Sequence, residues 1–125
     1  MKNDDIEYSL ILTIVNRGYA ELAVDAAREA GARGGTIIYA RGTGVFDMAK
    51  FLNISILPEK EIVLTLVRKE DVRNVIHSIL DVTGLRTKAA GISFTLPVTD
   101  FVGFSSQIGH LPYEDEDIKP DDKQK

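Results

Sequence analysis

The chain has no cysteine and no tryptophan, and only 7% of its 125 residues are aromatic. The lack of cysteine excludes disulfide bridges, thiolate metal sites and a cysteine nucleophile. No apolar run approaches the length that crosses a membrane, and residues 1–5 are polar and acidic, unlike a signal peptide. We therefore expect a cytoplasmic protein that does not insert directly into a membrane.

Positive charge is also in the minority, since 15 lysine and arginine residues stand against 19 acidic residues. Much of the excess lies in residues 113–125, which hold six acidic residues and three lysines. The rest of the chain is close to neutral, and because nucleic-acid binding needs a basic face, we expect no nucleic-acid partner. The composition predicts one folded domain over residues 1–111 and an acidic, disordered tail over residues 112–125.

Residues that could support catalysis or hold a metal are few. His77 lies on the polar side of a predicted helix and His110 lies near the tail, and neither has a neighbouring pair of an acid and a nucleophile. No group of His, Asp and Glu has the spacing of metal ligands. We therefore expect no catalytic residue, no metal site and no enzymatic activity.

Hydrophobic periodicity predicts the same plan of three elements twice. The first copy has a strand at residues 8–15, a helix at 19–30 that ends at Gly31, and a strand at 36–40. The second copy has a strand at 61–67, a helix at 70–82 that ends at a left-handed Gly84, and a strand at 91–96 closed by Pro97. A doubled β-α-β unit predicts a ferredoxin-like α+β fold, with two helices on one face of a four-stranded antiparallel sheet.

The first predicted strand is apolar on both of its sides. Leu10, Leu12 and Ile14 lie on one side, and Ile11 and Val15 lie on the other. The helices cover only one face of the sheet, and a face that meets water is normally polar. We expect the second face to be buried against copies of the same chain.

Two glycine-containing segments are candidates for binding a small anion, such as a phosphate ester. Residues 34–44 read Gly-Gly-Thr-Ile-Ile-Tyr-Ala-Arg-Gly-Thr-Gly, so Arg41 stands beside a turn whose backbone amides can face an anion. Residues 83–88, Thr-Gly-Leu-Arg-Thr-Lys, add the cations Arg86 and Lys88 at the matching place in the second copy. Alternatively, Arg41 is a solvated loop residue, the two later cations favour a helix dipole, and Thr83 only caps the helix.

These segments, in their order and spacing, resemble the PII signal-transduction proteins and their PII-like relatives. Residues 34–44 resemble the strand that leads into the base of the family's long T-loop. Residues 60–64, Lys-Glu-Ile-Val-Leu, resemble the return from that loop, and Thr83 with Gly84 resembles the start of its phosphate-binding B-loop. Residues 96–102 are similar to the segment before the C-terminal loop.

The resemblance implies a homotrimer whose clefts between subunits bind an adenine nucleotide (AMP, ADP or ATP) as effector. It also implies a signalling protein whose T-loop docks on a transporter, an enzyme or a regulator, and which does not catalyse a reaction. Carried over by position, the expected nucleotide-binding residues are Gly35, Arg41, Gly42, Thr43, Gly44, Leu64, Thr83 and Gly84, with Arg86 and Lys88 facing phosphate.

The chain also departs from the pattern of the family. The glycine-rich series of the B-loop is replaced by Leu-Arg-Thr-Lys-Ala-Ala-Gly, and Gly103 and Ser105 stand where two phosphate-binding arginines are expected. Val45 and Phe46 replace the glutamine that helps to hold magnesium and 2-oxoglutarate, and the T-loop is short and has no tyrosine. These differences predict a divergent member that binds a smaller or less charged adenine nucleotide and does not sense 2-oxoglutarate.

Residues 45–57 are unusually apolar for a loop. We expect Phe46, Met48, Phe51 and Leu52 to dock a protein partner, because aromatic and methionine side chains form adaptable surfaces. The alternative is a short helix over residues 45–52 that packs on its own trimer. For the whole protein, the alternative function is a small enzyme or metal-handling protein on a ferredoxin-like scaffold.

Overall fold

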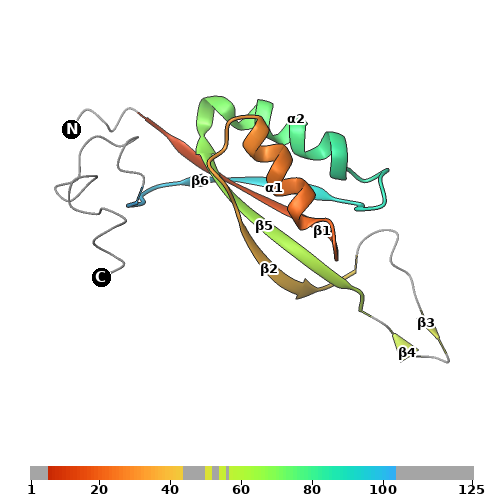
Figure 1. The fold of residues 1–125 in the computed structure, drawn as a ribbon. Coiled ribbons are helices and arrows are strands. Elements are labelled where there is room, and N and C mark those ends of the chain that lie inside the picture. Colours follow the sequence, from red (N-terminus) through yellow and green to blue (C-terminus); the bar gives the residue numbers. More distant parts are fainter. Residues whose placement is uncertain (1–5, 44–49, 52–53, 56, 104–125) are drawn as a thin grey trace, which may run out of the picture.

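The computed structural model describes residues 6–43, 50–51, 54–55 and 57–103. One antiparallel sheet has the strand order β2-β5-β1-β6, formed by β1 (Tyr8–Asn16), β2 (Thr36–Arg41), β5 (Glu59–Arg68) and β6 (Ile92–Val98). Helices α1 (Ala20–Glu29) and α2 (Val72–Thr83) pack against each other on one face of this sheet (Figure 1). A short hairpin pairs β3 (Lys50–Phe51) with β4 (Ile54–Ser55). The four-stranded sheet with two helices confirms the predicted ferredoxin-like fold.

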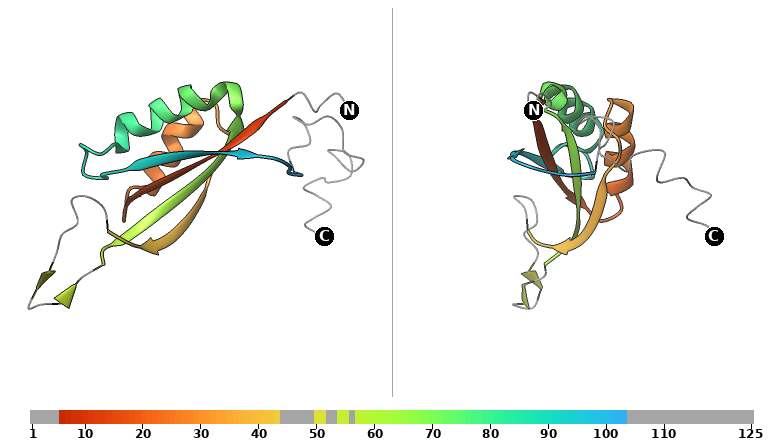
Figure 2. Two further views of the ribbon diagram at one scale, coloured as in Figure 1. Left: turned by 180° about the vertical axis from the view of Figure 1, so that it is seen from behind. Right: turned by 90° about the vertical axis from the view of Figure 1, so that its left-hand side faces the viewer.

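The two faces of the sheet differ because strand residues alternate between them. On the helix side, Ile11, Val15 and Val63 are fully buried and form the core with α1 and α2. On the other side, which we call the open face, Leu10, Leu12 and Ile14 stay half-buried. The edge-on view in Figure 2 shows both helices on the same side of the sheet. The open face therefore has no covering layer within the described part of one chain.

Helix α1 ends as the sequence predicts. Gly31 has a φ of 113°, and its N–H donates to the carbonyl of Arg28 at 3.0 Å. The N–H of Ala32 donates to the carbonyl of Ala27 at 2.9 Å. This pair of bonds is the Schellman arrangement, in which a left-handed glycine turns the chain out of the helix.

The prediction that Gly84 at the end of α2 is left-handed is wrong, because this glycine has a φ of −63°. A side chain at Gly84 would instead place its Cβ 2.6 Å from the carbonyl oxygen of Leu80. Glycine is therefore required here for close backbone approach and not for a left-handed conformation. The left-handed residue of this connection is Ala90, with a φ of 47°.

Two element boundaries and one element type differ from prediction. Pro97 lies inside β6, opposite Ser9 of β1. An edge strand tolerates proline because, among the residues that the structure describes, one side of its backbone has no partner strand. Helix α2 begins at Val72, because Lys69–Asp71 form a separate 3-10 turn, η2. Residues Lys50–Phe51 are a strand, so the alternative of a helix over 45–52 fails at these two positions.

Candidate functional site

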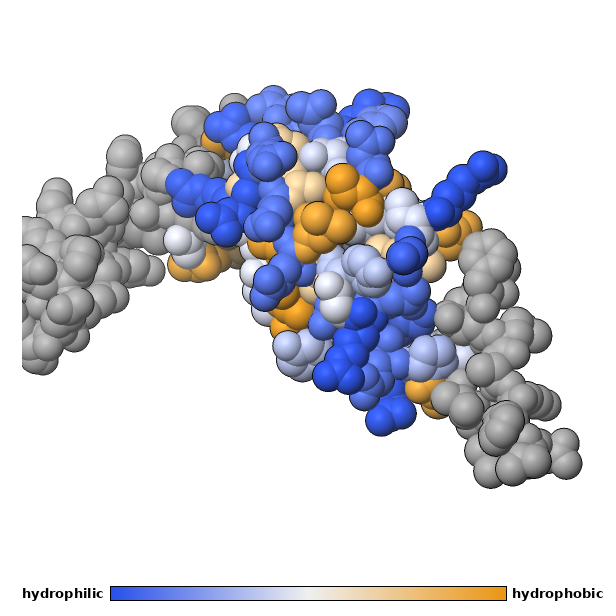
Figure 3. Space-filling view, turned by 45° about the vertical axis from the view of Figure 1, so that its right-hand side comes forward, coloured by the Kyte–Doolittle hydropathy of each residue, from blue (hydrophilic) through white to orange (hydrophobic). Residues whose placement is uncertain are grey.

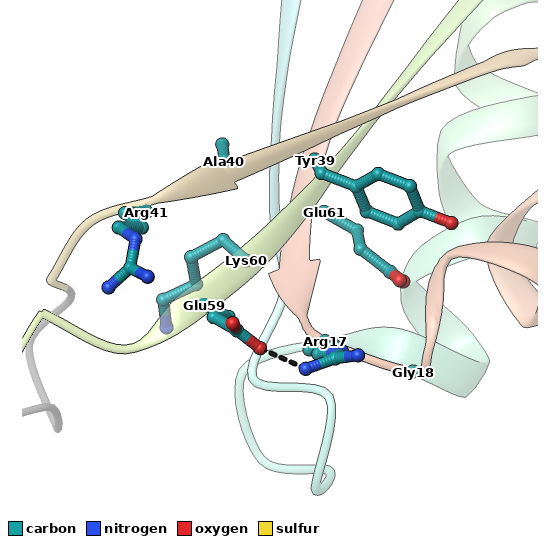
Figure 4. Close-up of a pocket in the computed structure, with 8 residues that line it drawn as sticks. All are labelled: Arg17, Gly18, Tyr39, Ala40, Arg41, Glu59, Lys60 and Glu61. Atoms are coloured by element: carbon teal, nitrogen blue, oxygen red, sulfur yellow. Dashed lines mark hydrogen bonds and ion pairs between the residues drawn. The ribbon is translucent and has the colours of Figure 1, made fainter.

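A pocket of about 630 Å³ lies on the helix side of the sheet, at the end from which residues 42–58 leave it. Its walls come from the turn between β1 and α1, the end of β2 and the start of β5. It is lined by Arg17, Gly18, Tyr39, Ala40, Arg41, Glu59, Lys60 and Glu61 (Figure 4). A volume of this size is in the range of small-molecule sites.

Arg41 is an exposed cation of this pocket. Its guanidinium donates to the carbonyl of Leu57 at 3.5 Å, which is at the limit of a hydrogen bond. The next residue, Gly42, donates its N–H to the carbonyl of Pro58 at 3.1 Å. These contacts tie the two ends of the 42–58 segment together at the edge of the pocket.

Two carboxylates of the pocket already have partners. Glu59 forms an exposed ion pair with Arg17, drawn as a dashed line in Figure 4, and the N–H of Arg17 donates to the carbonyl of Glu59 at 3.3 Å. The buried Glu61 accepts the N–H of Ala20 at 2.9 Å. Since Tyr19 gives α1 no side-chain cap, Glu61 caps this helix from a distant strand.

Asn16 connects the pocket to the second glycine-containing segment. Lys60 is a buried residue, and its ammonium donates to the Asn16 side-chain oxygen at 2.7 Å, while Asn16 Nδ2 donates to the carbonyl of Lys88 at 2.9 Å. The N–H of Asn16 also donates to the carbonyl of Ala89 at 2.9 Å. The 84–91 loop is therefore held beside the strand end that carries Lys60.

The structure brings together some of the predicted nucleotide-binding residues. Arg41, Gly42 and Thr43 lie at the strand exit, and the Asn16 bridge holds Lys88 at this same end, with Arg86 in the same loop. Gly84 begins this loop. Thr83 is fully buried, and its hydroxyl donates to the carbonyl of Ile79 at 2.7 Å.

Other predicted site residues lie far from Arg41 or are not among the residues that the structure describes. Thr36, which follows Gly35, pairs with Leu64, and the six residues from Thr36 to Arg41 are separated by five steps that span about 17 Å of strand. Gly35 and Leu64 are therefore far along the sheet from Arg41 within one chain. Phe51 lies in β3. Gly44, Phe46, Met48 and Leu52 lie outside the described residues.

Of the eight residues that line the pocket, sequence reasoning assigned only Arg41 to a binding site. It missed the other seven, which are Arg17, Gly18, Tyr39, Ala40, Glu59, Lys60 and Glu61. Strand alternation was a usable signal for Tyr39, because it lies two residues before Arg41 and so on the same side of β2. The pairing of Tyr39 with Glu61 and of Arg41 with Glu59 depends on the register between β2 and β5, which periodicity alone does not supply.

The charges of the pocket nearly balance. Three cationic side chains against two carboxylates leave a formal charge of +1. Figure 3 shows hydrophilic side chains gathered on the surface beside the grey loop at this end of the molecule.

Neither a cluster of metal ligands nor a membrane-spanning helix is found among the described residues. In the part of the chain that the structure describes, no three His, Cys, Asp or Glu side chains are placed to hold a metal ion. Nor is any described helix long and apolar enough to cross a membrane.

Comparisons with known proteins identify the family. Residues 8–107 match the model of the nitrogen regulatory protein P-II family. Arabidopsis thaliana PII bound to citrate is similar in fold, with a TM-score of 0.62 and 23% identity over 80% of this chain and 82% of that chain. A protein from Thermus thermophilus described as PII-like has a TM-score of 0.56 and 18% identity over 74% of this chain and 87% of that chain. A search of curated proteins gives no match. Because the family model covers most of the chain and the fold agrees, this protein belongs to the nitrogen regulatory protein P-II family.

Proposed function

We propose that this protein is a cytoplasmic regulatory homotrimer that binds an adenine nucleotide between its subunits and signals to a protein partner through residues 45–57. The observation that supports this most is the bridge from Lys60 through Asn16 to the 84–91 loop. It holds the two predicted phosphate-binding segments at one end of the sheet, where the 42–58 segment begins and ends. A ligand at this end would contact the base of the loop directly.

The phosphate end of the nucleotide faces Arg41, the backbone of Gly42, Thr43 and Gly44, and the loop that carries Arg86 and Lys88. Arginine suits this role because its guanidinium keeps its charge and binds phosphate with two parallel donors. Thr83 and Gly84 support the loop from the end of α2. The remaining residues of the family pattern, Gly35 and Leu64, are too far from Arg41 to meet the same phosphate, so they line the rest of the cleft.

The homotrimer would bury the open face of the sheet. Large apolar side chains cover this face on all four strands, and those on β2 and β6 are about half exposed in the single chain. They are Leu10, Leu12, Ile14, Ile38, Ile62, Leu64, Leu66, Ile92, Phe94 and Leu96. An apolar area of this extent is typical of a protein–protein interface.

The partner-binding role of residues 45–57 follows from their position. The segment begins at the proposed phosphate site, so a nucleotide can shift its conformation by the difference in affinity between two loop states. Phe46, Met48, Phe51 and Leu52 are the proposed docking side chains. We favour this regulatory role over an enzyme or a metal-handling protein, because the described residues bring no nucleophile and base together in the pocket.

Calorimetry with AMP, ADP, ATP and citrate tests the proposal. Replacing Arg41 by alanine should weaken nucleotide binding by about ten- to a hundredfold, the value of one charge-assisted contact. Arg28→Ala, which removes an exposed arginine from the last turn of α1, is the control and should leave affinity unchanged. If no nucleotide binds below millimolar concentration, or if only citrate binds, adenine nucleotides are not the effectors.

A further inference from the structure

Tyr39 presents an unusual surface inside the pocket. This residue is 77% exposed, although it lines a concave site beside the start of α1. Tyr39 and Arg41 project from the same side of β2, about 7 Å apart along the strand. Figure 4 shows the tyrosine ring and the Arg41 guanidinium on the pocket side of β2, whereas Ala40 points away. A flat ring face beside a cation suits a ligand that carries both a planar base and an anionic group.

The charge pattern limits how many anionic groups such a ligand can carry. Of the three cations that line the pocket, Arg17 is paired with Glu59 and Lys60 donates to Asn16. Arg41 makes only the long contact to Leu57 among the described residues. Among the residues that line the pocket, the Arg41 guanidinium is therefore the one that remains exposed for an anionic group, whereas Arg86 and Lys88 belong to the neighbouring 84–91 loop.

Glu59 stands directly opposite Arg41 in the pairing of β2 with β5. Its side chain is 46% exposed and lies on the pocket side of the sheet. A second or third phosphate beside Arg41 would approach this carboxylate, and it could gain the attraction of Arg17 only by breaking the ion pair of Arg17 with Glu59. At a separation of about 4 Å in water, one such repulsion weakens binding by about fivefold.

We propose that Tyr39 and Glu59 determine the selectivity of the nucleotide site. Tyr39 stacks on the base, and Glu59 favours a nucleoside monophosphate over the di- and triphosphate. This inference rests on the proposed function, because it assigns the base and the phosphate of the same nucleotide to one wall of the pocket.

The test measures dissociation constants for AMP, ADP and ATP by calorimetry on the full chain and on its variants. The unchanged chain should bind AMP at least about tenfold more tightly than ATP, and Glu59→Gln should reduce this ratio to about twofold or less. Glu7→Gln removes a carboxylate from another exposed ion pair, with Lys69 at the opposite end of β1, and should leave the ratio unchanged. Tyr39→Ala should weaken all three nucleotides equally, by about ten- to a hundredfold, while Tyr39→Phe keeps the affinity.

The outcomes separate the two proposals. If nucleotides bind but Glu59→Gln leaves the ratio of AMP to ATP affinity unchanged, the role of Glu59 is refuted and the nucleotide site stands. If Tyr39→Ala binds as well as the unchanged chain, the base does not lie on this ring. If no nucleotide binds to the unchanged chain, the proposed function fails and this inference fails with it.

Discussion

Replacing Glu61 should reveal how α1 is anchored to the sheet. The Glu61 carboxylate is buried and accepts the N–H of Ala20, the first residue of α1, at 2.9 Å. In Glu61→Ala this buried N–H loses its acceptor, which costs about 1–3 kcal/mol, and the helix loses a negative charge at its N-terminus, worth about 0.3–1 kcal/mol. We expect the free energy of unfolding to fall by about 2–3 kcal/mol.

Glu61→Gln separates the two contributions, because the amide oxygen can still accept the hydrogen bond while the charge is lost. It should cost only about 0.3–1 kcal/mol. Glu21→Ala removes an exposed acid from the first turn of the same helix and should cost less than about 1 kcal/mol. The assay is urea unfolding followed by circular dichroism, at one protein concentration because assembly alters the apparent stability. Equal losses for Glu61→Ala and Glu21→Ala would refute the capping role.

Two further predictions concern the open face and the end of α2. Phe94→Lys places a charge in the proposed interface and should give a monomer in light scattering. Thr95→Lys, on the other side of β6, is the control and should leave the assembly intact. A trimer in both variants would exclude this face from the interface. Gly84→Ala should lower the free energy of unfolding, measured in urea, by about 1–3 kcal/mol, because the alanine Cβ would lie 2.6 Å from the backbone oxygen of Leu80. An unchanged midpoint of urea unfolding would show that α2 relaxes at no cost.

The arrangement of elements could be predicted from the sequence because each element has a clear local signal. The apolar stripes of two helices and the alternation in the strands are properties of short windows, and the structure places all six elements close to where they were expected. Gly84 shows the limit of this reasoning. A glycine after a helix suggests a left-handed cap, but only the close approach of Leu80 shows why glycine is needed there.

The pocket could be predicted only in part, because its contacts join residues far apart in the chain. Arg41 carried a local signal in the glycines that follow it. No local signal pointed to the partners of Glu61 and Lys60, since these partners, Ala20 and Asn16, lie more than forty residues away in sequence. Such contacts depend on the register of β5 against β1 and β2.

Hydrogen exchange with and without AMP tests most directly whether a nucleotide at this end of the sheet controls the 45–57 loop. We expect slower exchange in residues 39–43 and 84–91 when AMP is bound, together with a changed pattern across residues 45–57. The Arg41→Ala variant at the same AMP concentration should lose most of these changes. Identical exchange across all three segments, with AMP at a concentration that saturates binding in calorimetry, would contradict both the site and its coupling to the loop.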